Sequence, residues 1–168
     1  MILARDIVAD AAPSCTIDLT LAFQNRETAA LHEAWRRLGG NRGTPYRRDF
    51  DPRDHVALLP HMFVIEATDD PEPRFRYRLV GTNIVETIGR DATGTWVDDL
   101  YKDAPEVVEG FRALLQKGRP VRTFGKLTWV GKDFLSYESG IFPLLTDEGR
   151  IGRFVGLTIY SPSKSSAD

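Results

Sequence analysis

The C-terminal part of the chain restricts its fold most strongly, because it contains three strand-length segments in succession. These segments lie at about 120–130, 134–145 and 151–160. The short turns GKD at 131–133 and TDEG at 146–149 separate them. Strands joined by such turns pair with their neighbours in opposite directions, so this region predicts an antiparallel meander.

A second pair of strands precedes the meander. MFVIEAT at 62–68 is a short apolar strand, and the turn DDPEP separates it from RFRYRLV at 74–80, which predicts an antiparallel hairpin. In the second of these strands Phe75, Tyr77 and Leu79 alternate with arginines. Because successive side chains of a strand point to opposite faces, we expect these three on one face, under the helices.

Helical periodicity marks the segments before and between the strands. NRETAALHEAWRRLGG at 25–40 has a capping residue, Asn25, and an apolar stripe, and two glycines end it. The stripe consists of Leu31, Trp35 and Leu38. Asp51 and Pro52 begin one or two helical turns, GTNIVETIG forms a short helix, and APEVVEGFRALLQKG forms a longer one.

The order of these elements predicts an α+β domain, with an antiparallel sheet and helices collected over one face. The alternation of strand, helix and strand that builds a doubly wound dinucleotide fold is missing. Gly81, Gly89 and Gly94 are too dispersed to form a phosphate-binding glycine loop.

The chain divides into four predicted parts. Residues 1–18 form a mostly flexible tail, 19–53 the first helix and an irregular connector, 54–160 the core, and 161–168 a disordered tail. One segment has two interpretations: CTIDLTLAF at 15–23 alternates like a strand, but it also fits a backward extension of the first helix.

Composition limits the compartment and the partners. The 168 residues include 22 basic and 24 acidic side chains, and the net charge of −2 gives no general attraction to nucleic acid or to a membrane. No segment is apolar enough to cross a bilayer. The single cysteine, Cys15, cannot form an internal disulfide, so we expect a cytoplasmic protein.

Motifs for catalysis and metal binding are missing from the sequence. The three histidines lack the spacing of a zinc site, and no serine lies in a G-x-S-x-G elbow. The carboxylate pairs at 69–70 and 98–99 lie in predicted turns, where such pairs face water. We therefore expect neither enzymatic activity nor a metal.

Four stretches resemble the PAS sensor superfamily: AWRRLGGNRGTPYRRDFDP, LLPHMFVIE, FRYRLVGTNIVETIGRDATG and SYESGIFPLL. They span about residues 25–160 and resemble in particular a stand-alone PAS family of alphaproteobacteria. The resemblance implies a five-stranded antiparallel sheet that cups a small pocket under short helices. It also implies sensing, and pairing with a second copy.

The resemblance allows the prosthetic groups of the superfamily to be compared with this sequence. Flavin photosensors carry a reactive cysteine in the segment that corresponds to GRDATGTWVDDLY, which contains none. Haem-binding relatives supply a histidine from the helical region, and residues 82–118 contain none. Flavin, haem and a thioester-linked chromophore are therefore disfavoured. A small ligand bound without a covalent bond, or no ligand, remains.

The candidate ligand-binding residues are the aromatic and apolar side chains that such a pocket would collect. They are Phe75, Tyr77, Leu79, Trp96, Tyr101, Phe111, Trp129, Tyr137 and Phe154. Each also fits a simpler interpretation, in which it fills the core. Tyr77, Thr123, Ser136 and Glu138 could orient a ligand, but a slip of one residue in register would move each to the other face.

Two surface features indicate partners. PAS relatives commonly dimerise through an amphipathic helix before the core, and Leu31, Trp35 and Leu38 would form that contact here. The alternative is that this stripe packs on the chain's own sheet. Residues 36–53, the end of the first helix and the connector, contain the arginines Arg36, Arg37, Arg42, Arg47, Arg48 and Arg53. We interpret it as a solvated segment, with an acidic partner or a phosphate-bearing second messenger as alternatives and nucleic acid least favoured.

These observations lead to one functional prediction with two alternatives. We expect a homodimeric PAS module in bacterial signal transduction that binds a small ligand, a signalling partner such as a histidine kinase, or both. The first alternative is a ligand-free adaptor whose pocket its own side chains fill. The second is a small-molecule enzyme on a similar curved sheet.

Overall fold

The structure is a computed structural model, and it describes residues 15–102 and 105–164. Six strands form one antiparallel sheet in the order β1-β4-β5-β6-β2-β3. Their bounds are β1 Cys15–Asp18, β2 Met62–Ala67, β3 Phe75–Val80, β4 Val121–Leu127, β5 Lys132–Leu145 and β6 Ile151–Pro162.

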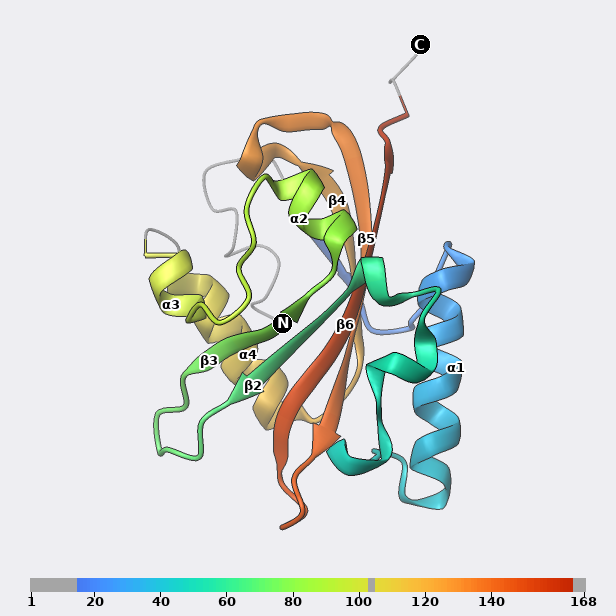
Figure 1. The fold of residues 1–168 in the computed structure, drawn as a ribbon, viewed down its shortest axis with the longest axis vertical. Coiled ribbons are helices and arrows are strands. Elements are labelled where there is room, and N and C mark those ends of the chain that lie inside the picture. The colour runs from blue at the N-terminus through green and yellow to red at the C-terminus, as the bar shows by residue number, and fades with distance from the viewer. Residues whose placement is uncertain (1–14, 103–104, 165–168) are drawn as a thin grey trace.

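Four α-helices surround this sheet. They are α1 Arg26–Gly39, α2 Thr82–Ile88, α3 Val97–Leu100 and α4 Pro105–Lys117, and short 3₁₀ turns occupy part of the connector between α1 and β2. Helix α1 lies on one side of the sheet, and α3 and α4 lie on the other (Figure 1). We call these two sides the α1 face and the inner face.

The predicted α+β class and the antiparallel pairing of the hairpin and the meander are confirmed, but the sheet has a sixth strand. Strand β1 pairs with β4, so residues 15–18 belong to the sheet and not to a flexible tail. The strand ends at Asp18 because its carboxylate accepts hydrogen bonds from the backbone N–H groups of Thr20 and Ala22, which bend the chain. The other residues of the predicted N-terminal tail, 1–14, lie outside the described part of the chain.

The α1 face holds a closed apolar core. Its buried members come from α1, the connector and three strands: Leu31, Trp35, Phe50, Met62, Val64, Phe142, Leu144, Val155 and Leu157. The Trp35 Nε1–H group donates to the backbone oxygen of Pro143 at 2.7 Å, so the indole is both buried and hydrogen-bonded. The amphipathic stripe of α1 is therefore used inside the chain itself.

The N-terminus of α1 is capped by a strand residue distant in sequence. We expected Asn25 to cap it, but the side chain of Asn25 accepts no capping hydrogen bond. Instead the Glu138 carboxylate of β5 accepts from the backbone N–H groups of Gln24 and Asn25 at 2.8 and 3.0 Å, and from the Thr28 hydroxyl. Arg122 also donates to Glu138 at 2.8 Å, so this buried carboxylate is paired and hydrogen-bonded.

The inner face holds a second core, centred on three phenylalanines. Phe75, Phe111 and Phe154 come from β3, α4 and β6, with ring centroids 5.5 Å apart for Phe75 and Phe111 and 6.1 Å apart for Phe111 and Phe154. Phe75 and Phe154 are 1% and 0% exposed. These rings attach α4 to the sheet.

The prediction that Phe75, Tyr77 and Leu79 share one face is wrong for Leu79. Tyr77 pairs with Ile65 and Leu79 pairs with Val64, so one extra residue, Arg78, lies between them in β3. This β-bulge reverses the alternation. Leu79 consequently packs against the core of the α1 face, while Tyr77 packs against the inner core.

Candidate functional site

Four of the five tyrosines of the chain gather on the inner face, beyond the phenylalanine core. Tyr77 lies on β3, Tyr101 follows α3, and Tyr137 and Tyr160 are directly opposite each other on β5 and β6. We call them the tyrosine cluster. Three separate parts of the chain supply them, so the sheet and the segment after α3 must both be folded for the cluster to exist.

Three phenol groups of the cluster are largely buried, and two of them are hydrogen-bonded to each other. Burial raises the pKa of Tyr77 well above its ordinary value, and a side-chain hydrogen bond with Tyr101 adds to this shift. Burial also raises the pKa of Tyr101 and of Tyr160. All three phenols are therefore neutral at physiological pH and can donate hydrogen bonds.

The strand positions next to the tyrosine cluster are also uncharged. Ser139 and Thr158 face each other across β5 and β6 with their hydroxyl oxygens 2.7 Å apart, and both are 7% exposed. The ammonium group of Lys132, at the start of β5, donates to the backbone oxygen of Thr87 at the end of α2. Strand residues thus offer hydroxyl groups and apolar surface here, but no charge.

The tyrosine cluster is packed less completely than the phenylalanine core. Tyr77, Tyr101, Tyr137 and Tyr160 all keep part of their surface accessible, although burial shifts the pKa of three of them. The phenylalanine and tyrosine ends of one face therefore differ in packing as well as in polarity.

The structure brings together only part of the predicted ligand-binding set. Tyr77, Tyr101 and Tyr137 lie in the cluster, whereas Phe75, Phe111 and Phe154 form the adjoining buried core. Leu79 lies on the α1 face. The side chain of Trp129 lies outside the described part of the structure.

Trp96 lies at the edge of the sheet and not beneath the helices. Its ring stacks with the guanidinium groups of Arg74 and Arg76, at 4.2 and 5.4 Å from the ring centroid. Trp96 also forms a β-bridge with Arg76, so it attaches the loop before α3 to the outer edge of β3. The sequence analysis placed Trp96 in the pocket because it is aromatic, but its ring stacks on two arginines of β3 instead.

The four polar candidates are divided between the two faces. Tyr77 and Thr123 face the inner side, because Thr123 is two residues from the inner-core residue Val121. Glu138 instead serves α1, and the Ser136 hydroxyl is 3.1 Å from that of Ser163. The sequence analysis did not include Tyr160 and the Ser139–Thr158 pair, although the alternation of β6 around Phe154 points to Thr158 and Tyr160.

The predicted dimer stripe is mostly buried in the chain's own core. Leu31 and Trp35 are 0% and 6% exposed, because they pack against β5 and β6, and only Leu38 is exposed, at 37%. The alternative interpretation, packing on the chain's own sheet, is therefore the one that the structure supports for Leu31 and Trp35.

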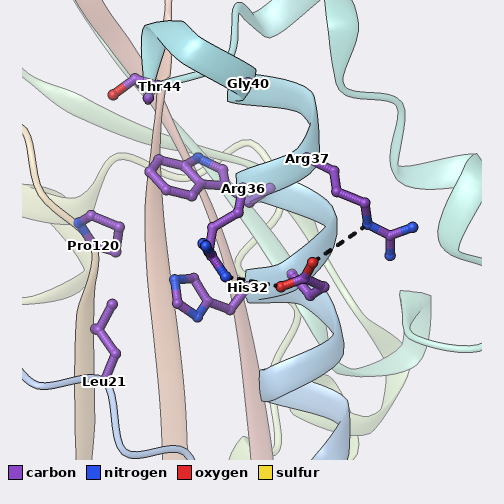
Figure 2. A pocket seen from close by; sticks show the side chains of 10 residues that line it. Leu21, His32, Arg36, Arg37, Gly40, Thr44 and Pro120 are labelled. Atoms are coloured by element: carbon purple, nitrogen blue, oxygen red, sulfur yellow. Dashed lines mark hydrogen bonds and ion pairs between the residues drawn. The ribbon is translucent and has the colours of Figure 1, made fainter.

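A groove of about 560 Å³ runs along α1 on the side of Leu21 and Pro120 (Figure 2). His32 and Trp35 line it from the helix, and the Arg36 side chain extends toward His32, while Arg37 points away on the other side of the helix. Burial lowers the pKa of His32, so this imidazole is neutral at physiological pH.

Metal ligation and membrane insertion have no support in the described residues. Within residues 15–102 and 105–164, no group of three His, Cys, Asp or Glu side chains could hold a metal ion. No helix in these ranges is both long and apolar enough to span a membrane.

Comparisons with known proteins agree with this architecture. The family model described as PAS domain matches residues 23–159. No curated protein shows significant similarity to the chain.

Among solved structures, an RNA-binding light-oxygen-voltage receptor is 13% identical with a TM-score of 0.44, over 64% of this chain and 31% of its own. The dark-state structure of the blue-light photoreceptor aureochrome1 LOV is 15% identical with a TM-score of 0.43, over 69% of this chain and 85% of its own. These likenesses carry no argument about ligand or partner.

Proposed function

Because this chain belongs to the PAS domain family, we propose that it is a regulatory module that binds a small uncharged ligand at the tyrosine cluster. The observation that carries the proposal is the convergence of Tyr77, Tyr101, Tyr137 and Tyr160 on one face, with part of each side chain accessible. Small-molecule sites are mostly apolar surfaces with a few convergent polar groups, which is the composition found here.

The chemistry of this surface limits the ligand. A charged group placed beside the cluster would lose its hydration without gaining a partner of opposite charge from the strands, which is costly. Neutral phenols and the Ser139–Thr158 hydroxyls can donate hydrogen bonds to carbonyl, ether or ring-nitrogen acceptors. The ligand we propose is therefore a neutral molecule with an apolar body and a few acceptor atoms.

Haem and a cysteine-linked flavin do not fit this set of residues. Residues 89–101 contain neither cysteine nor histidine. The strand residues beside the cluster provide no cation, and the charge that acts on Tyr101 is that of Arg90 in the loop before α3. The absorption spectrum of the purified protein tests this part of the proposal, since either group would give visible absorption bands.

The output of the module passes, in this proposal, to another protein. Tyr137 and Glu138 are neighbours on β5 and face opposite sides, so a ligand that displaces β5 at Tyr137 also acts on the carboxylate that caps α1. A ligand shifts the equilibrium between two conformations of the protein only as far as it binds one of them more tightly than the other. A histidine kinase, or a second copy of the chain, is the partner class we propose.

A thermal-unfolding screen of neutral metabolites tests the proposed function. We expect at least one compound to raise the melting temperature of the wild type, and Tyr77→Phe together with Tyr160→Phe to abolish that rise. Leu38→Ala, a substitution on the other side of the sheet, is the matched control and keeps it. Stabilisation that persists in the double tyrosine variant would show that the cluster is not the site.

The groove beside α1 favours a second candidate function, a ligand-free adaptor. It presents the neutral His32 imidazole next to the Arg36 guanidinium, a surface that a protein partner could occupy without any ligand. If partner binding is lost in Arg36→Glu and is unchanged in the double tyrosine variant, the adaptor function is the better description.

A further inference from the structure

Arginines gather around a single glutamate on the α1 face, at the β3 side of the sheet. Glu66 of β2 pairs directly with Arg153 of β6 and with Arg76 of β3 in the strand register. Its carboxylate lies 3.1 Å from a nitrogen of Arg153 and 3.2 Å from Nε of Arg78, the bulge residue. We call Arg47, Arg76, Arg78 and Arg153 the arginine cluster.

The arginine cluster has more positive charge than its surroundings neutralise. Two guanidinium groups, those of Arg78 and Arg153, share the Glu66 carboxylate, and among the described residues no ion pair joins Arg47 or Arg76 to a carboxylate. Arg76 instead donates to the backbone oxygen of Gly94 at 2.9 Å. This surplus stands out in a chain whose overall charge is −2.

Three aspartates of the described chain pair with arginines that do not belong to the cluster. Asp98 accepts two hydrogen bonds from Arg74, each at 3.1 Å. Asp147 pairs with Arg48 at 2.7 Å, and Asp69 pairs with Arg150. These three carboxylates are therefore paired with arginines outside the cluster.

Arg153 is the least solvated member of the arginine cluster. Its side chain is 18% exposed, and its Nε–H group is buried without a hydrogen-bond partner in the described structure. Burial lowers the pKa of Arg153, and the charges of Arg47 and Arg78 lower it further against the effect of Glu66. Guanidinium groups gathered around one carboxylate repel one another, and a bound anion would relieve that repulsion.

We propose that the arginine cluster binds a phosphate group, carried by a small phosphorylated metabolite or present as the free ion. Guanidinium forks match the tetrahedral oxygens of phosphate, and a dianion offsets the surplus charge better than a single carboxylate does. Arg76, Arg78 and Arg153 come from the sheet itself, so they are held in place before the anion arrives. This site is separate from the tyrosine cluster, which lies on the inner face.

Thermal unfolding of the full chain in sodium phosphate tests the proposal against sodium chloride at equal ionic strength. We expect a saturable rise in melting temperature with phosphate but not with chloride. Non-specific stabilisation by phosphate through exclusion from the surface rises without saturation and is equal in all variants. Adenosine diphosphate compared with adenosine then distinguishes a phosphorylated metabolite from the free ion as the source.

Three variants decide the outcome. Arg78→Gln, in an exposed side chain, should remove the saturable rise, and Arg26→Gln on α1 should keep it. Glu66→Gln removes the competing carboxylate and should raise phosphate affinity about fivefold to tenfold. An unchanged response in Arg78→Gln, or no gain in Glu66→Gln, would overturn the proposal. Binding of a phosphoserine peptide without binding of phosphate or adenosine diphosphate would overturn it as well.

Discussion

The two faces of the sheet differ in how completely they use their side chains. On the α1 face Leu31, Met62 and Phe142 are each 0% exposed, and Glu138 accepts hydrogen bonds from α1, its preceding residues and Arg122. On the inner face the phenylalanine core is similarly closed, but the tyrosine cluster next to it remains partly accessible. The apolar core of the α1 face is therefore completed by the chain itself, and the inner face is complete only at one end.

The two regions should have different roles: the closed core stabilises the fold, and the tyrosine cluster binds the ligand. A closed core with satisfied polar groups contributes most to the free energy of unfolding and tolerates little change. A surface of partly accessible tyrosines contributes less to folding and keeps polar groups that a ligand can meet. Substitutions on the two faces should thus have effects of different size and different kind.

The largest expected loss of stability follows from Glu138→Ala. It removes the closer of the two carboxylates that pair with buried Arg122, leaving Asp18 at 3.2 Å, and takes the cap from the α1 N-terminus, so we expect a loss of about 3 kcal/mol in the free energy of unfolding. Urea unfolding measures it. Glu33→Ala, in an exposed ion pair of the same helix, is the control and should change the value by less than about 0.5 kcal/mol. Equal effects of both substitutions would remove the distinction between the faces.

Truncation within the α1 stripe should have the next largest effect. Leu31→Ala leaves a cavity in the closed core, and we expect a loss of about 3 kcal/mol. Leu38→Ala in the same stripe is more exposed and should cost less than about 1 kcal/mol. If Leu38→Ala instead lowers stability in a way that depends on protein concentration, Leu38 lies in an interface between copies, as the sequence analysis predicted.

The pH dependence of stability should separate the faces as well. Burial raises the pKa of Glu138, but hydrogen bonds from Thr28, the backbone and Arg122 outweigh it and hold that pKa below 4.5. Stability from this group is complete above pH 4.5 and is lost as the pH falls through the folded-state pKa. Unfolding midpoints measured in acid should therefore vary less with pH in Glu138→Gln than in the wild type.

The tyrosine cluster should determine how the stability of the protein changes at alkaline pH. Burial raises the pKa of Tyr77 and Tyr101 above the ordinary value of 10.0, so their contribution is complete below that pH and is lost as the pH rises through the folded-state values. Tyrosinate absorbance against pH should show late ionisation in the folded wild type. Ionisation of all tyrosines at their ordinary pKa would mean that the cluster is open to water.

Tyr160→Phe should change stability much less than Glu138→Ala or Leu31→Ala does. It removes one hydroxyl and keeps the ring, so the free energy of unfolding of the ligand-free protein should fall by no more than about 1 kcal/mol. The same substitution should weaken the ligand-induced rise in melting temperature. A loss of stability as large as that of Leu31→Ala would show that the hydroxyl is structural.

Local sequence patterns predicted the elements of this fold well, because their signals are local. Alternation identified β2 and β3, the turn TDEG lies between β5 and β6, and the Asp51–Pro52 start is confirmed by a hydrogen bond from the Arg53 backbone N–H to Asp51. The resemblance to PAS proteins added the correct superfamily, which the match over residues 23–159 confirms. Its alphaproteobacterial detail stays a prediction.

The site was predicted less well, because its determinants are not local. The extra residue Arg78 moved Leu79 to the other face, and a bulge has no signal in the alternation of a short strand. Glu138 caps a helix more than a hundred residues away in sequence, which no local capping rule could reveal. Trp96 was misplaced because its partners are arginines of an adjacent strand.

Native mass spectrometry of the freshly purified protein tests the central claim most directly, since it reports bound mass and number of copies together. We predict an additional small-molecule mass on the wild type that is retained in Leu38→Ala and lost when Tyr77→Phe and Tyr160→Phe are combined. The bare chain mass in every variant, after the metabolite screen has also found no stabilising compound, would contradict the claim. So would a bound mass that the double tyrosine variant retains.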